Sequence, residues 1–166
     1  GKSYFVKEKL LANKELPCLI YDVQNAYGDT STKPNDLILN LPIDVKGEAK
    51  RCRLYGDSTD FLNIAIRRRK TNIVIEEATI FFEGKTQKEM RRLIVDRYHY
   101  QNNIFILFHS INAVPPRILE MSDIIVLFKT GDDQTIIKRK YGKLLPHYLK
   151  LQKNCMHFEN YIESFF

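Results

Sequence analysis

Short apolar runs alternate along the chain with longer segments of mixed polarity. Four of these runs end in polar residues: CLIYD (18–22), NIVIEE (72–77), NIFILFHS (103–110) and DIIVLFKT (123–130). Runs in which consecutive residues are apolar are typical of strands that are buried on both faces, as in parallel sheets. The pattern therefore predicts a mostly parallel sheet with helices over both faces.

The segments between the runs show the spacing of amphipathic helices. Apolar residues recur there every three or four positions, and Asp57, Ser58 and the Pro115–Pro116 pair supply helix starts. This predicts helices within 4–14, 57–70, 85–100, 115–122 and 144–166.

Three further segments have weaker signals. LILNLPI (37–43) and KRCRLYG (50–56) are expected to be short strands beside a turn at Lys46 and Gly47. IIKRKYG (136–142) is expected to be a strand that returns after the turn TGDDQT (130–135). The expected organisation is one domain, residues 1–166, with a core at 1–131 and a C-terminal hairpin and helical tail at 132–166.

Polar side chains finish the predicted parallel strands. In open α/β sheets, ligands bind beyond the carboxyl ends of the strands, so these side chains are expected to converge. They are Asp22, Glu76, Glu77, His109 and Ser110.

Composition narrows the class of protein. With 166 residues and 44% hydrophobic residues the chain can bury a core, and no apolar run is long enough for a membrane span. We expect a soluble protein that is not secreted. Cys18, Cys52 and Cys155 lack the spacing of a metal or redox site. The net charge of +6 favours polyanionic partners.

The first three residues, GKS, match the end of the phosphate-loop pattern GxxxxGK[ST]. In that loop the lysine reaches the β and γ phosphates and the hydroxyl ligates magnesium. Lys2 and Ser3 are therefore candidate contacts to a nucleotide and its metal.

Adjacent carboxylates end the second buried strand. Glu76 is placed to hold a magnesium ion through its water shell, and Glu77 to orient or deprotonate an attacking water. The alternative is that one or both glutamates cap the following segment or pair with Arg or Lys.

These motifs occur in an order that resembles a known family. GKS, PCLIYDVQNAYGD, RRRKTNIVIEEATIFF and the segment from RRLIVDRYHY to KTGD resemble the FtsK/HerA superfamily of RecA-like DNA-pumping ATPases. Within it, the chain is most similar to viral genome-packaging ATPases and to zonula-occludens-toxin-like assembly ATPases of filamentous phages. The resemblance covers roughly residues 1 to 131.

The resemblance implies a RecA-like, three-layer P-loop NTPase from which the first strand and the front of the phosphate loop are missing. It implies ATP and Mg²⁺ as cofactors, with Glu76 as the Walker B acid and Glu77 as the catalytic glutamate. His109 takes the place of a sensor that is commonly glutamine. The implied nucleotide contacts are Gly1, Lys2, Ser3 and Asp22, although Asp22 is as readily a cap for the next loop.

The family also implies an arginine finger that completes the site of a neighbouring subunit. Arg97 fits best, with Arg92 and Arg91 as weaker candidates. The expected partners are DNA and further copies of the chain in a ring, a hexamer or pentamer, with a viral capsid vertex or a membrane assembly complex. The expected location is the host cytoplasm or the virion.

We therefore predict an ATP-driven DNA translocase that packages a viral genome. One alternative is a phage-assembly or conjugation ATPase that extrudes DNA, and another is a non-hydrolysing structural module. The basic run 67–70 is either a DNA contact or a solvated face, and the run 138–143 either contacts a nucleic-acid backbone or guards an exposed edge strand by its charge.

Overall fold

The computed structural model describes residues 2–10, 16–24, 36–40, 51–153 and 160–164. The chain consists of two compact units. One is a sheet unit, Ser3–Leu107, and the other is a C-terminal unit made of Gly1–Lys2 and Phe108–Phe166. The turn expected at Lys46 and Gly47 lies outside the described residues.

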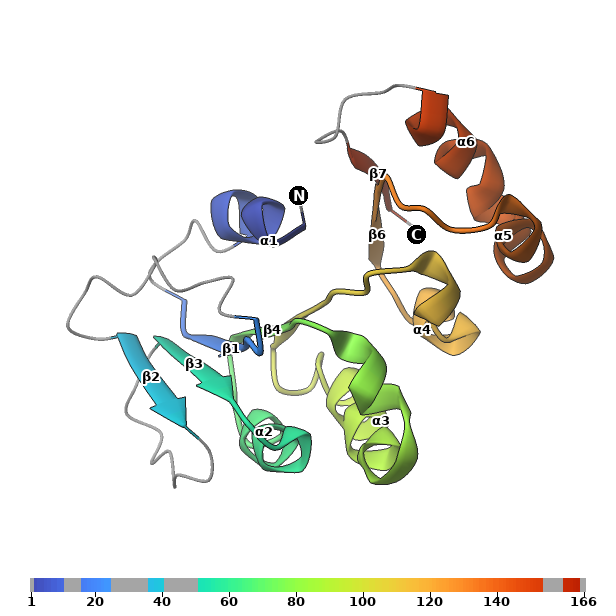
Figure 1. Cartoon of the computed structure of the whole chain (residues 1–166). Coiled ribbons are helices and arrows are strands. Elements are labelled where there is room, and N and C mark those ends of the chain that lie inside the picture. The colour runs from blue at the N-terminus through green and yellow to red at the C-terminus, as the bar shows by residue number, and fades with distance from the viewer. Residues whose placement is uncertain (1, 11–15, 25–35, 41–50, 154–159, 165–166) are drawn as a thin grey trace. The chain divides into compact units, whose positions relative to one another are not determined.

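The sheet unit contains a five-stranded parallel sheet in the order β2-β3-β1-β4-β5. Its strands are β1 (Cys18–Tyr21), β2 (Asp36–Asn40), β3 (Arg51–Tyr55), β4 (Asn72–Ile75) and β5 (Asn103–Ile106), and Figure 1 labels β1 to β4. All four pairings among them are parallel, as the apolar runs predicted.

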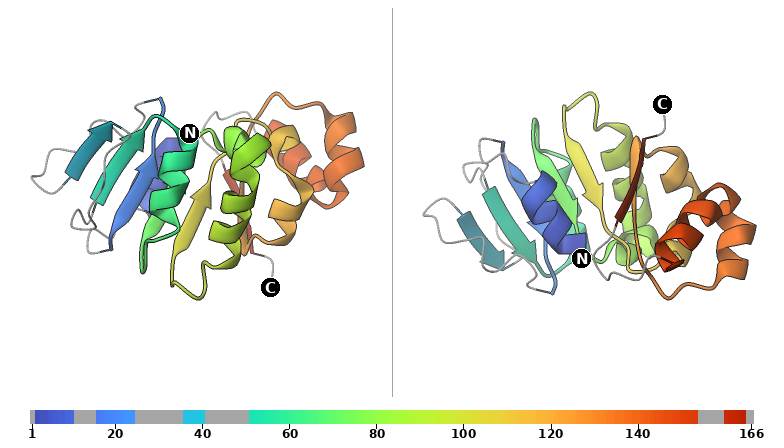
Figure 2. Two further views of the ribbon diagram at one scale, coloured as in Figure 1. Left: turned by 90° about the horizontal axis from the view of Figure 1, so that it is seen from below. Right: turned by 90° about the horizontal axis from the view of Figure 1, so that it is seen from above.

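Side chains of the central strands alternate between two apolar layers. Cys18, Ile20 and Val74 pack with Val6 and Leu107 on one face. On the other, the ring of Tyr21 lies 5.0 Å from that of Phe61 and 4.9 Å from that of Phe81. Helical segments therefore cover both faces of the sheet, as Figure 2 shows in its two views.

The helices of the sheet unit follow from capping and apolar spacing. These elements are α1 (Lys2–Phe5), the π-helix Val6–Leu10, α2 (Ser58–Ala65), the 3₁₀ helices Ala78–Phe82 and Gly84–Thr86, and α3 (Gln87–Val95). The Asp57 carboxylate caps α2 by accepting hydrogen bonds from the N–H groups of Thr59 (2.7 Å) and Asp60 (3.2 Å). These hydrogen bonds lower the pKa of Asp57.

The C-terminal unit combines short helices with a two-stranded sheet. Its elements are the 3₁₀ helix Ile111–Ala113, α4 (Pro116–Glu120), β6 (Ile124–Phe128), α5 (Gln134–Tyr141), the 3₁₀ helix Gly142–Leu144, α6 (Leu145–Lys153) and β7 (Asn160–Ser164). β6 is a strand, as predicted, but within the described residues it pairs with β7 in antiparallel orientation, so its expected place in the parallel sheet is wrong.

The returning strand predicted at 136–142 is wrong, because this segment lies mainly in helix α5. Asp133 caps the helix by accepting a hydrogen bond from the N–H of Thr135 at 2.7 Å. Ile137 and Tyr141, four residues apart, are both buried on its inner face. The expected C-terminal hairpin at 132–142 is therefore absent from the described part of this segment.

The helical prediction for 144–166 is correct only at its start. Helix α6 ends at Lys153, and Asn160–Ser164 forms strand β7. Tyr161 and Ile162 have high strand propensity, and pairing with β6 supplies the partner that a short strand requires. Residues 154–159 and 165–166 lie outside the described part of the chain.

Candidate nucleotide site

Two acidic residues meet at the carboxyl ends of neighbouring parallel strands. Tyr21 and Ile75 are opposite each other in the β1–β4 register, so Asp22 and Glu76 follow at the same level. The N–H of Glu76 donates to the carbonyl of Tyr21 at 3.2 Å. Asp22 and Glu76 are only 3% and 6% exposed. The predicted convergence of these two residues is confirmed.

A hydroxyl from the start of the chain contacts this acidic edge. Ser3 Oγ donates a hydrogen bond of 2.8 Å to Glu76 Oε1, across 73 positions of sequence. The two residues expected to serve magnesium are therefore adjacent. Mg²⁺ favours oxygen ligands and is commonly held by one or two protein oxygens together with waters and phosphates. A hydroxyl beside a carboxylate fits that requirement.

The described residues contain no cluster of three or more His, Cys, Asp and Glu side chains that would hold a metal by themselves. A divalent ion at Ser3 and Glu76 would therefore need oxygen ligands from water or phosphate.

Glu77 has an unusual backbone. Its φ of 51° and ψ of 49° lie in the left-handed region, where a residue other than glycine is strained by about 1 to 2 kcal/mol. The next N–H, that of Ala78, donates to the carbonyl of Leu107 at 3.0 Å. The strand thus stops between the two glutamates, and Glu77 stands at a sharp turn. No glycine or asparagine in the sequence signals this turn.

The roles predicted for these residues in contacting a nucleotide or its metal all remain predictions. Lys2 and His109 belong to the C-terminal unit, whereas the glutamates belong to the sheet unit. His109 is exposed, in the segment between β5 and the 3₁₀ helix Ile111–Ala113. Gly1 lies outside the described residues.

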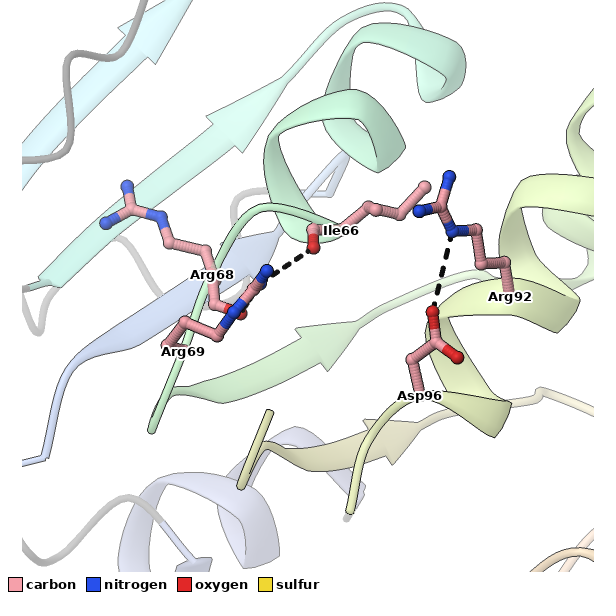
Figure 3. A network of polar contacts seen from close by, with 5 residues as sticks. All are labelled: Ile66, Arg68, Arg69, Arg92 and Asp96. Carbon is pink, nitrogen blue, oxygen red and sulfur yellow. Dashed lines mark hydrogen bonds and ion pairs between the residues drawn. The ribbon is translucent and has the colours of Figure 1, made fainter. Parts of the chain in front are cut away.

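The arginine-finger candidates lie at or near the opposite end of the sheet. Arg97 follows α3, and its guanidinium donates to the carbonyl of Ile94 at 2.8 Å and to the hydroxyl of Tyr98 at 3.1 Å. Arg91 and Arg92 are exposed on α3. Arg92 pairs with Asp96 at 3.5 Å (Figure 3), a surface ion pair of little energetic weight.

The basic run 67–70 lies at the amino end of the sheet, just before β4. Arg69 Nη1 donates to the carbonyls of Ile66 (3.1 Å) and Arg68 (2.8 Å), and its guanidinium stacks 3.2 Å from the ring centre of Tyr100. Figure 3 shows the side chain of Arg69 directed toward Ile66, while that of Arg68 extends away from it. Arg69 therefore stabilises its own loop.

A buried asparagine joins this loop to the segment before β5. The side-chain oxygen of Asn102 accepts from the N–H of Thr71 at 3.1 Å, and its amide nitrogen donates to the carbonyl of Arg68 at 3.0 Å. Asn102 is 6% exposed. The loop that carries the basic run is therefore held in place by hydrogen bonds to Asn102. The charge pattern of the sequence did not reveal this.

The second basic run lies on α5 and the short helix after it. Lys138, Arg139 and Lys143 are exposed, and Lys140 Nζ donates to the carbonyl of Asn112 at 3.3 Å.

No helix among the described residues is long and apolar enough to cross a membrane.

The architecture matches solved structures of one viral protein. The genome packaging NTPase B204 of Sulfolobus turreted icosahedral virus 2, in complex with AMPPCP, aligns with a TM-score of 0.73 over 99% of this chain and 86% of that chain, at 16% identity. The complex of the same NTPase with AMP gives a TM-score of 0.74 at 14% identity, over 99% and 86%. The chain has a P-loop NTPase fold.

A third solved structure has a similar fold. B204, the DNA-packaging ATPase from Sulfolobus Turreted Icosahedral Virus, aligns with a TM-score of 0.72 over 99% of this chain and 86% of that chain, at 13% identity. No family model matches this chain, and no curated protein matches it. At such low identity the likeness establishes the fold, and function has to be argued from the site.

Proposed function

We propose that this protein is an ATPase that drives viral genome packaging by translocating DNA. The observation that carries the proposal is the Ser3–Glu76 hydrogen bond of 2.8 Å at the carboxyl end of β4, followed directly by Glu77 in a left-handed conformation. Residues in strained conformations are concentrated at active sites. The likeness to an NTPase crystallised with AMPPCP and with ATP-gammaS supports the same chemistry.

In this proposal the residues have separate roles. Ser3 and Glu76 hold the magnesium ion and its water shell, and Lys2 contacts the phosphates. When bound, Mg²⁺ neutralises charge that develops on the β and γ phosphates. Glu77 orients the attacking water and accepts its proton, a contribution of about 100- to 10,000-fold for a well-placed general base. His109 senses the γ phosphate.

The proposed assembly is a ring, a hexamer or pentamer, in which Arg97 of one subunit reaches the nucleotide of the next. Arg97 precedes β5 at the amino end of the sheet, whereas Glu76 and Glu77 stand at the carboxyl end. One subunit would therefore offer its two sheet ends to two different sites. DNA, the polyanion favoured by the net charge of +6, is the proposed substrate for translocation.

The test is ATP hydrolysis by the full-length protein, with and without DNA. We expect hydrolysis that DNA stimulates, and a loss of about 100-fold or more in Glu77→Gln. Glu83→Gln is the matched control, because Glu83 is an exposed glutamate six positions further along the same segment. No hydrolysis by wild type under either condition would reject the proposal in favour of a structural module, and equal rates in the two variants would reject the role of Glu77.

A further inference from the structure

Asp132 is the centre of a polar cluster in the C-terminal unit that sequence analysis did not single out. Its carboxylate accepts hydrogen bonds from the hydroxyl of Ser110, from Thr130 Oγ1 at 2.5 Å, from the N–H of Ile111 at 3.0 Å and from the N–H of Asn112 at 3.4 Å. Three of the four donors lie in the tripeptide that directly follows His109.

The electrostatics of the cluster favour an ionised carboxylate. Burial alone raises the pKa of Asp132, but the hydrogen bonds from Ser110, Thr130 and the two backbone N–H groups outweigh it and leave the pKa below its ordinary value. Charge-assisted hydrogen bonds of this kind are shorter and stronger than neutral ones. Segment 110–112 is thus held by a permanent negative charge near neutral pH.

Helices α5 and α6 fix the other side of the cluster. Tyr148 donates to the carbonyls of Thr130 (3.0 Å) and Asp132 (2.8 Å), and Gln152 donates to the carbonyl of Thr130 at 2.5 Å. The hydroxyl of Tyr141 donates to the carbonyl of Val114. Tyr141 and Tyr148 belong to the apolar core of this unit. Asp132 therefore connects a packed helical pair to the segment after His109.

We propose that Asp132 is a positioning residue for ATP hydrolysis that acts through His109. This inference rests on the proposed function, in which His109 contacts the γ phosphate. The carboxylate fixes the three residues after His109 and so restricts where the imidazole can lie. Misplacement of a catalytic group by about 1 Å can cost about 100-fold in rate.

Asp132→Asn in the full-length protein tests the inference. Asparagine replaces one carboxylate oxygen with an NH₂ group, which cannot accept the hydrogen bonds donated to that oxygen. Segment 110–112 then loses part of what holds it in place. We expect kcat for ATP hydrolysis to fall by about 10- to 100-fold, with KM for ATP within about twofold of wild type. Asp133→Asn is the matched control: the same change one residue away, at a helix cap where asparagine works as well as aspartate.

A double variant separates positioning from general stability. If Asp132 acts through His109, adding Asp132→Asn to His109→Ala causes no further loss of kcat, whereas independent roles give losses that multiply. Should Asp132→Asn fail to fold, Ser110→Ala removes one donor to the same carboxylate and should lower kcat at unchanged KM.

The outcomes are distinct. Equal kcat in Asp132→Asn, Asp133→Asn and wild type, or multiplying losses in the double variant, would overturn this inference while the proposed ATPase stands. An unchanged kcat in Ser110→Ala would overturn it where Asp132→Asn does not fold. A wild-type protein without ATP hydrolysis would overturn both.

Discussion

The two ends of the parallel sheet in the sheet unit differ in charge and in construction. At the carboxyl end, buried Asp22 and Glu76 stand on adjacent strands, and Glu76 is contacted by a hydroxyl from a distant part of the chain. At the amino end, the largely exposed basic run 67–70 lies on a loop that is held by nearby carbonyls, a tyrosine ring and Asn102.

From this difference we infer that the two ends of the sheet have different roles. Buried carboxylates are costly unless a cation or hydrogen-bond donors compensate them, as the Ser3 hydroxyl does for Glu76, and a carboxylate beside a hydroxyl offers the oxygen ligands that a divalent ion takes. Exposed basic residues cost little and attract polyanions over a distance set by salt. We therefore propose that the chemistry takes place at the carboxyl end and that contacts with partners are made at the amino end.

The largest effect at the amino end is expected from Arg97→Ala. If Arg97 completes a neighbour's site, its loss should reduce ATP turnover by about 1000-fold, the lower range for an arginine finger. Arg117→Ala, at an exposed arginine on α4, is the control and should retain activity. In rings mixed with wild type, the variant should depress activity more than dilution predicts; a strictly proportional loss would argue against action between subunits.

A smaller effect, on DNA affinity rather than turnover, is expected from the basic run. The triple variant Arg67→Ala, Arg68→Ala, Lys70→Ala leaves Arg69 in its structural contacts. Loss of three phosphate contacts would reduce the slope of log affinity against log salt by about 2 to 3.

The matched control for that triple variant lies in the C-terminal unit. Lys138→Ala, Arg139→Ala and Lys143→Ala remove three exposed charges and leave Lys140 bonded to the carbonyl of Asn112. Binding to duplex DNA at several salt concentrations distinguishes the two groups. A reduced slope in the control and not in the first variant would move the DNA contact to α5.

The smallest effect is on stability. Asn102→Ala leaves the N–H of Thr71 and the carbonyl of Arg68 without their partner, so the free energy of unfolding should fall by about 1 to 3 kcal/mol. Asn63→Ala, at an exposed position on α2, is the control and should change it by less than about 0.5 kcal/mol. Urea denaturation measures both. Equal stability of the two variants would show that Asn102 does not brace the loop.

The sequence predicted the parts of the fold that depend on local pattern. Apolar runs such as NIVI gave buried parallel strands because both faces of such a strand are covered. Asp57 and the spacing of Phe61, Leu62 and Ala65 predicted α2, because capping and periodicity act within a few residues.

One local signal was misinterpreted: the Ile136–Ile137 pair favoured a strand, whereas the cap at Asp133 and the four-residue spacing of the buried Ile137 and Tyr141 belong to a helix. Features that depend on distant contacts were not predictable from local pattern. The turn at Glu77 and the network around Asp132 arise from tertiary contacts that no short pattern encodes. Sequence motifs therefore identified the residues of the candidate site, whereas only the structure showed how these residues are arranged.

The measurement that tests the division of roles most directly is the magnesium dependence of ATP binding in Glu76→Gln and Glu77→Gln, compared with wild type. We predict that Glu77→Gln binds Mg-ATP as wild type does while failing to hydrolyse it. Glu76→Gln should require a higher Mg²⁺ concentration to reach the same affinity. A shift of the same size in both variants, or no shift in Glu76→Gln, would contradict the assignment of metal to one glutamate and water to the other.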